Sequence, residues 1–249
     1  WGHQIPAWYG PDKKVFVAIN ESEAQKISKK HYKRKVELIR DPDVLDTWFS
    51  SGLWPFATLG WPIKNEYLKK FYPTTVLVTG FDIIFFWVAR MIMFGMEFLN
   101  KEPFKEIYVH ALVRDEKGQK MSKSKGNVID PLELIEKYSA DALRFTLLSM
   151  ASPGRDVKLS EDRVKGYRNL LNKLWNANNF LIQNKCNFSN IKKPSKIKIN
   201  INKWIYAQLL EVKVKVEKNI TDYRFDEAAR NIYQFVWHSY CDWYLELSK

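Results

Sequence analysis

An apolar stretch at residues 83–99 constrains the fold more than any other part of this 249-residue sequence. Its hydrophobic side chains recur on nearly all sides of a helix, which predicts a buried helix rather than a surface one. Strand-like segments stand on both sides of it, at residues 75–78 and 106–113. This strand–helix–strand order is typical of an α/β layered domain with a parallel sheet.

A membrane span is disfavoured in the same region. Residues 76–95 are apolar, but Asp82 and Arg90 would be costly at the middle of a bilayer. Gly80 divides the segment into a strand-like and a helix-like half. No basic-then-apolar leader opens the sequence. We therefore expect no membrane association.

The cysteine and histidine content predicts no metal site. Cys186 and Cys241 lie far apart without paired spacing, which argues against a disulfide framework and a cysteine-based zinc site. It also fits a reducing cytosol. His3, His31 and His238 have no partners that suggest a metal and are interpreted as structural or surface residues.

A formal net charge of +12, from 40 Lys and Arg against 28 Asp and Glu, favours polyanionic partners. Each neutralised phosphate releases condensed counterions, so such a surplus assists nucleic-acid binding. A solvated basic surface would give the same count. Charge alone therefore leaves the question open.

The second half of the sequence is predicted to be helical. Val164, Tyr167 and Leu171 recur at helical spacing, and further helices are predicted at residues 203–219 and 224–247. A polar linker at about residues 184–200 precedes these two, and the helices are expected to form an antiparallel bundle.

Shorter signals predict the local structure of the first half. A strand is predicted at residues 15–19, within an otherwise irregular opening, and another at residues 44–49. Residues 115–118 (Asp-Glu-Lys-Gly) supply turn chemistry. Asp130 is a good N-cap, Pro131 suits the first helical position, and Glu133 stands where a capping-box acid belongs, so a helix should begin there.

A basic loop at residues 120–124 (Lys-Met-Ser-Lys-Ser), set between Gly118 and Gly126, carries the clearest chemistry. Two lysines three residues apart, among small hydroxyl residues, make a mobile cationic flap that can close over a triphosphate. Lys120 and Lys123 would then act as point charges where negative charge builds during attack on the α-phosphorus. A solvated basic loop is the alternative that composition leaves open.

This loop resembles the lysine signature of class I aminoacyl-tRNA synthetases, and the likeness covers nearly the whole chain. Residues 109–115 (Val-His-Ala-Leu-Val-Arg-Asp) and 126–131 (Gly-Asn-Val-Ile-Asp-Pro) are similar to the valine, isoleucine and leucine group. Residues 46–55 (Asp-Thr-Trp-Phe-Ser-Ser-Gly-Leu-Trp-Pro) and 79–87 (Thr-Gly-Phe-Asp-Ile-Ile-Phe-Phe-Trp) resemble its valine-specific members. Further similar segments lie at residues 1–6, 140–145 and 224–230.

The resemblance implies a fold and a division of the chain. Residues 1–40 would be a connective segment that follows an insertion, and residues 41–145 the second half of a Rossmann-like α/β catalytic domain. Residues 146–249 would be a stem-contact region and a truncated, all-α anticodon-binding domain. The family's His-Ile-Gly-His signature and editing domain have no counterpart here, so the chain is interpreted as a fragment that is inactive alone.

The resemblance also implies roles for single residues on the amino-acid side. Asp82 would hold the ammonium group of the amino acid, and a helix-capping role is its alternative. Trp48 and Ile83 would wall a small aliphatic pocket, with Trp87 a further contributor. For tryptophans in general, plain core packing is the competing interpretation.

On the nucleotide side, ATP would contact Lys123 and Ser122, while Gly80 would let the backbone approach closely. His110 would lie beside the adenine or serve as a structural histidine. Mg²⁺ would accompany the triphosphate, and no zinc is implied.

The implied function is ATP-dependent activation of valine and its ligation to tRNA(Val), by a cytoplasmic monomer. We expect tRNA contacts on accessible helix faces at Arg163, Lys165, Arg168 and Lys173. Two alternatives remain: a basic helical tRNA-binding module without catalysis, and an isoleucine-specific relative.

Overall fold

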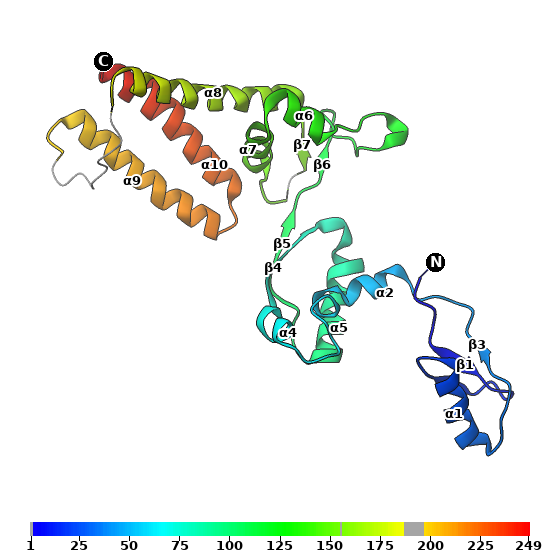
Figure 1. The fold of residues 1–249 in the computed structure, drawn as a ribbon. Helices are drawn as coiled ribbons and strands as arrows, with labels where there is room; N and C mark the ends of the chain where they lie inside the picture. Colours follow the sequence, from blue (N-terminus) through cyan, green and yellow to red (C-terminus); the bar gives the residue numbers. More distant parts are fainter. Residues whose placement is uncertain (1, 155, 187–196) are drawn as a thin grey trace. The chain divides into compact units, whose positions relative to one another are not determined.

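The computed structural model describes residues 2–154, 156–186 and 197–249. The chain forms two compact units, Trp1–Ile107 and Tyr108–Lys249, which are coloured blue to green and green to red in Figure 1. The expected domain boundaries after residues 40 and 145 stay predictions. The polar linker expected at residues 184–200 falls mostly on 187–196, outside the described residues.

The first unit opens with a small antiparallel sheet. β1 (Ala7–Tyr9) pairs on one side with β2 (Val15–Val17) and on the other with β3 (Ile39–Arg40). Trp8, which is 3% exposed, packs with Ala18 and Ala24 beneath it. The strand predicted at residues 15–19 is confirmed.

The helix α1 (Glu21–Tyr32) in this opening is not predicted by the sequence pattern. Its N-cap is Asn20, whose side chain accepts a hydrogen bond from the Glu23 N–H. It buries only two small residues, Ala24 and Ser28, so its sequence carries little hydrophobic periodicity. The packing of Ala24 against the sheet supplies what the pattern lacks.

The strand predicted at residues 44–49 is wrong. Only Val44 pairs, in an isolated bridge with Gln4, and helix α2 (Thr47–Gly52) begins three residues later. Tertiary contacts outweigh the strand-like composition here. Arg90 forms an ion pair with Asp46 at the start of α2, at 3.2 Å, and the Trp87 indole N–H donates to the carbonyl of Ser51, at 3.1 Å.

The helix predicted at residues 83–99 is confirmed, although its start is irregular. After α3 (Trp54–Ala57), α4 (Glu66–Phe71) and β4 (Thr74–Gly80), the chain makes a 3₁₀ turn, η1 (Phe81–Ile83), a π-helical turn, η2 (Ile84–Val88), and α5 (Ala89–Leu99). Val88 and Met91 are buried with Phe104 at the start of β5 (Phe104–His110). Phe85 is 77% exposed, so burial on all sides is not observed in the described part of this unit.

The second unit begins with a short parallel pair and continues as helices. β6 (Val113–Arg114) pairs with β7 (Val157–Lys158). Between and after them lie η3 (Lys123–Lys125), α6 (Pro131–Tyr138), α7 (Ala140–Met150), α8 (Glu161–Gln183), α9 (Asn200–Thr221), α10 (Phe225–Gln234), η4 (Phe235–Tyr244) and α11 (Leu245–Leu247).

Two cores hold these helices together. Leu134, Leu143 and Val164 join α6 and α7 to the start of α8, and Ala177 packs with Cys241 at its far end. Figure 1 shows α9 running back beside α10, so the predicted antiparallel bundle and both of its later helices are confirmed. The helices in the described ranges are all too short or too polar to cross a membrane.

Candidate functional site

The basic loop is built on a tight turn that leaves β6. The Gly118 N–H donates to the Asp115 carbonyl at 2.9 Å, and the Asp115 N–H donates to the Gln119 carbonyl at 3.1 Å. Gly118 has φ +80°, a left-handed conformation that favours glycine. The turn predicted at residues 115–118 is confirmed, and an isolated bridge between Arg114 and Lys120 closes it.

The side chain of Asn127 joins the two ends of this loop. Its amide nitrogen donates to the Asp115 carboxylate at 2.7 Å and to the Lys120 carbonyl at 3.3 Å, and its amide oxygen accepts from the Ser122 N–H at 2.9 Å. The hydrogen bond from Asn127 is the largest cause that lowers the pKa of Asp115, followed by one from the Gln119 N–H. Asp115 is therefore charged over the physiological range.

The lysines of the loop face no counter-ion in the described structure. Lys120, Lys123 and Lys125 are all exposed, and none makes an ion pair with a described carboxylate. Gly126 follows with φ +65°, and a Cβ there would meet nothing within 4 Å. Positive charge is thus available to an anion, as the flap interpretation requires.

The far end of the loop is fixed by the start of α6. The Asp130 carboxylate accepts from the Leu132 N–H at 2.8 Å, and Pro131 occupies the first turn. The predicted cap is confirmed. Leu134 is buried against α7 and α8. The loop therefore runs between two anchored elements, β6 at its start and α6 at its end.

In the first unit, Asp82 lies in the 3₁₀ turn that follows β4. Its side chain is exposed, and it caps no helix: Gly80 is the N-cap residue, with no side-chain cap bond. The helix-capping alternative for Asp82 is therefore not observed. Gly80 itself is buried at the end of β4. The π-helical turn that follows is a feature that proteins often place at functional sites.

The aromatic residues expected near Asp82 have different surroundings. Trp48 is half-buried and stacks on Phe86, with ring centroids 5.8 Å apart. Trp87 packs in the core with Val88 and donates its indole N–H to α2, so it has a structural role whatever else it does. Ile83 is half-buried at the junction of the 3₁₀ and π turns.

The expected nucleotide-contacting residues fall in both units. Gly80 belongs to the first, together with Asp82, and His110 belongs to the second, together with the lysine loop. His110 is exposed at the end of β5, with Nδ1 2.9 Å from the carbonyl oxygen of Ala111. Each unit therefore carries part of the predicted constellation.

The four basic residues expected to contact tRNA all lie on α8, but they are not equivalent. Arg163, Lys165 and Arg168 are exposed. The Lys173 side chain is only 28% exposed, forms an ion pair with Asp242, and lies 4.1 Å from the centre of the Trp237 ring. The expectation of an accessible charge is thus met by three of the four.

A groove of about 520 Å³ lies between α7, α8 and α10, and no sequence pattern predicts it. Its walls combine aromatic rings with charged groups, namely Phe145, Tyr167, Tyr233, Arg163, Asp226, Glu227 and Arg230. Such a groove forms only when three separate helices meet, so residue spacing within one helix does not reveal it.

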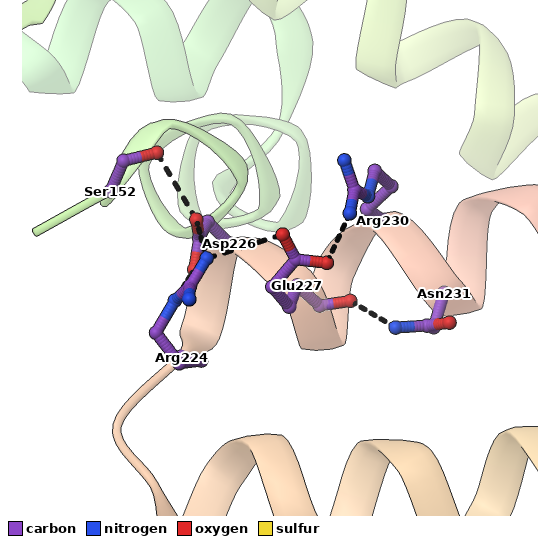
Figure 2. Close-up of polar contacts among 6 residues, drawn as sticks. All are labelled: Ser152, Arg224, Asp226, Glu227, Arg230 and Asn231. Atoms are coloured by element: carbon purple, nitrogen blue, oxygen red, sulfur yellow. Dashed lines mark hydrogen bonds and ion pairs between the residues drawn. The ribbon is translucent and has the colours of Figure 1, made fainter.

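The acidic wall of the groove is held by a network of ion pairs (Figure 2). The Arg224 guanidinium donates to both oxygens of Asp226, at 3.0 Å each, and to Glu227 at 3.2 Å. Ser152, beyond the end of α7, donates to Asp226 at 3.1 Å, and Arg230 also pairs with Glu227. Arg224 is the largest cause that lowers the pKa of Asp226. The network fastens α10 to the loop after α7.

Residues 1–160 match the family model of class I tRNA synthetases (I, L, M and V), which accounts for well over half of the chain. The chain belongs to this family. Residues 202–249 match a second model, the anticodon-binding domain of tRNA ligase. The expected fold class, an α/β domain followed by a helical bundle, is thereby confirmed.

Curated relatives agree with the family. The chain is 82% identical to the valine–tRNA ligase of Pelagibacter ubique and 59% identical to that of Bartonella henselae, over all 249 residues. It spans only 28% of the length of each.

Solved structures share the fold at low identity. A ternary complex of LeuRS, tRNA and LeuAMS from Agrobacterium radiobacter K84 matches 95% of the chain, over 35% of its own length, with a TM-score of 0.77 and 20% identity. A Mycobacterium tuberculosis methionyl-tRNA synthetase in complex with methionyl-adenylate matches 87% of the chain, over 46% of its length, with a TM-score of 0.64 and 21% identity.

We predict that Asp226→Asn loosens the start of α10. The Asp226 side chain is 11% exposed, and hydrogen bonds to a charged group contribute about 1.5–3 kcal/mol each. Hydrogen exchange of the first α10 amides in the full-length protein should therefore accelerate. Glu211→Gln, at an exposed pair within α9, is the matched control and should change little.

The same tie has a defined pH dependence. In the folded protein the pKa of Asp226 lies below its ordinary value of 3.8. The contribution of the ionised Asp226 to the stability of the fold is therefore complete above pH 3.8, and it is lost as the pH falls through the folded pKa. Protection of these amides that is unchanged by Asp226→Asn, or lost already between pH 7 and 5, would contradict this assignment.

Proposed function

We propose that this chain forms part of a valine–tRNA ligase, which activates valine with ATP and joins it to tRNA(Val). The observation that carries the proposal is the lysine loop, whose exposed cations have no described counter-ion. The 82% identity to a valine–tRNA ligase along the whole chain supports the choice of valine over isoleucine. A binding module without catalysis would have no need of such a loop.

In the first step, the valine carboxylate attacks the α-phosphorus of MgATP, valyl-adenylate forms, and pyrophosphate leaves. Negative charge gathers on the phosphate oxygens, and Lys120 and Lys123 would stabilise it there. Ser122 would offer a hydroxyl to the nucleotide, Gly80 would allow close approach of the backbone because it lacks a side chain, and His110 would lie beside the base. Mg²⁺ would accompany the triphosphate.

Recognition of valine would fall to the first unit. The exposed carboxylate of Asp82 suits an ammonium group, which every amino acid carries. Trp48, stacked on Phe86, and Ile83 would limit the size of the side chain that is accepted. Trp87 would contribute indirectly, because its indole N–H holds α2 and thereby Trp48.

Binding of tRNA(Val) would use the helical half. Arg163, Lys165 and Arg168 present charge on α8 to phosphates, which fix the register of a nucleic acid without reading its bases. Lys173 has a partner of its own and would contribute least. We place the protein in the cytosol, where free thiols such as those of Cys186 and Cys241 persist, and we propose that it acts as a monomer.

We predict that Lys123→Ala in the full-length protein lowers the kcat of valine-dependent pyrophosphate exchange on the order of 100-fold, with KM for valine nearly unchanged. The charge matters most in the transition state, where it meets the developing negative charge. Lys117→Ala, an exposed lysine in the adjoining turn, is the matched control and should retain full activity. A change confined to KM for valine would exclude this role for Lys123.

We also predict that the α8 cations set the salt dependence of tRNA binding. Alanine at Arg163, Lys165 or Arg168 should weaken binding, and the slope of log affinity against log salt should fall by about 1 for each phosphate that is no longer neutralised. Lys173→Ala should leave the slope unchanged while it removes the ion pair to Asp242 and destabilises the bundle. Titrations at several salt concentrations measure both, and the reverse ranking would refute the assignment.

A further inference from the structure

We propose that Asn127 and Asp115 are positioning residues for adenylate formation: their side chains form a tether that fixes the base of the lysine loop and so places Lys120 and Lys123. The proposal rests on the function proposed above for that loop. Neither residue is assigned to contact ATP or valine. Their role is to set where the loop begins and ends.

The geometry of Asn127 supports the tether. A side-chain amide has two N–H groups and one carbonyl oxygen, and all three groups are used. The N–H groups serve the Asp115 carboxylate and the Lys120 carbonyl, and the oxygen serves the Ser122 N–H. The Asn127 side chain thus binds the backbone on both sides of Met121, and it also binds the side chain of Asp115, the residue that opens the turn.

Asp115 is equally engaged. One carboxylate oxygen accepts from the Gln119 N–H at 2.6 Å and the other from the Asn127 amide at 2.7 Å. Hydrogen bonds to an ionised carboxylate are stronger than neutral ones. The pairing is directional: an amide that donates faces a carboxylate that accepts. A carboxylate at both positions would repel, and an amide at both would set one N–H group against another.

The loop beyond the tether has little else to hold it. Lys123–Lys125 form one 3₁₀ turn, and its only side-chain hydrogen bond among the described residues joins the Ser122 and Ser124 hydroxyls, at 3.2 Å. Gly126 follows in a left-handed conformation with open space around its Cα. The position of Lys123 therefore follows from the tether, and Lys120 is held both by the tether and by its bridge to Arg114. A displacement of about 1 Å at a reacting centre can cost about 100-fold in rate.

The test exchanges the two side chains in the full-length protein. Asp115→Asn and Asn127→Asp are made separately and together, and valine-dependent pyrophosphate exchange gives kcat and KM for each. We expect each single variant to lose at least about 10-fold in kcat, with KM for valine unchanged. In the double variant an amide at 115 again donates to a carboxylate at 127, which still accepts from the Ser122 N–H.

The double variant should therefore recover most of the lost kcat, short of full activity because the bond to the Lys120 carbonyl is missing. Asn127→Asp should also regain kcat as the pH falls, since protonation lets the two carboxyl groups share a hydrogen bond. If the two residues served stability alone, the variants would lower the melting temperature without a loss of kcat at unchanged KM and without the recovery of kcat at low pH. Single variants with wild-type kcat, or losses that simply multiply in the double variant, would overturn the tether.

Two controls match the chemical changes. Glu116→Gln removes a charge from the same turn, and Asn176→Asp adds one to an exposed position of α8; neither residue is part of the tether, and both variants should keep wild-type kcat. Lys123→Ala separates the two proposals. If it lowers kcat while the exchanged pair is not rescued, the tether alone fails. If Lys123→Ala leaves kcat unchanged, the proposed role of the lysine loop in adenylate formation is wrong, and the tether proposal fails with it.

Discussion

The packing of α6 and α7 against the start of α8 supports both functional regions of the second unit. Leu134 of α6, Leu143 of α7 and Val164 of α8 lie in one buried cluster. The lysine loop ends at Asp130, the N-cap of α6, and β7, which pairs with β6 at the other end of the loop, leads directly into α8. A single core thus fixes the two ends of the loop and the helix that carries the exposed cations.

Charge in this unit is divided between structure and function. Carboxylates such as Asp115, Asp226 and Asp242 are engaged by donors, and their pKa values are lowered as a result. Lys120 and Lys123 make no ion pair within the described ranges. An anion that neutralises them need not first displace a protein partner, so binding of a polyphosphate to these lysines breaks no existing ion pair in the described structure.

Much of this organisation can be predicted from local sequence. The turn at residues 115–118, the Asp130 cap, and the helices at 203–219 and 224–247 depend on neighbouring residues, so composition and spacing are enough. The residues of helix α2 have a strand-like local composition and therefore predict a strand. The contacts that hold them in a helix come from Arg90 and Trp87, some forty residues away in the sequence. Short-range propensity does not contain that information.

The candidate site shows the same limit. The lysines are found from their own motif, but Asn127 as the partner of Asp115 is not, because twelve residues separate the two side chains. In sequence Lys173 resembles the other basic residues of α8. In the fold it forms an ion pair with Asp242 and lies over the ring of Trp237, two residues that are distant in the sequence. Residues that carry chemistry are visible in sequence, whereas those that hold them become visible only in the fold.

The central claim is that this chain belongs to a site that activates valine. Pyrophosphate exchange by the full-length protein, measured with each standard amino acid in turn, tests it most directly. We predict the highest kcat/KM with valine and strong discrimination against the larger isoleucine. Threonine should be the closest competitor, because a hydrophobic pocket rejects an added hydroxyl poorly. Exchange that is fastest with isoleucine or leucine, or absent with every amino acid, would contradict the account.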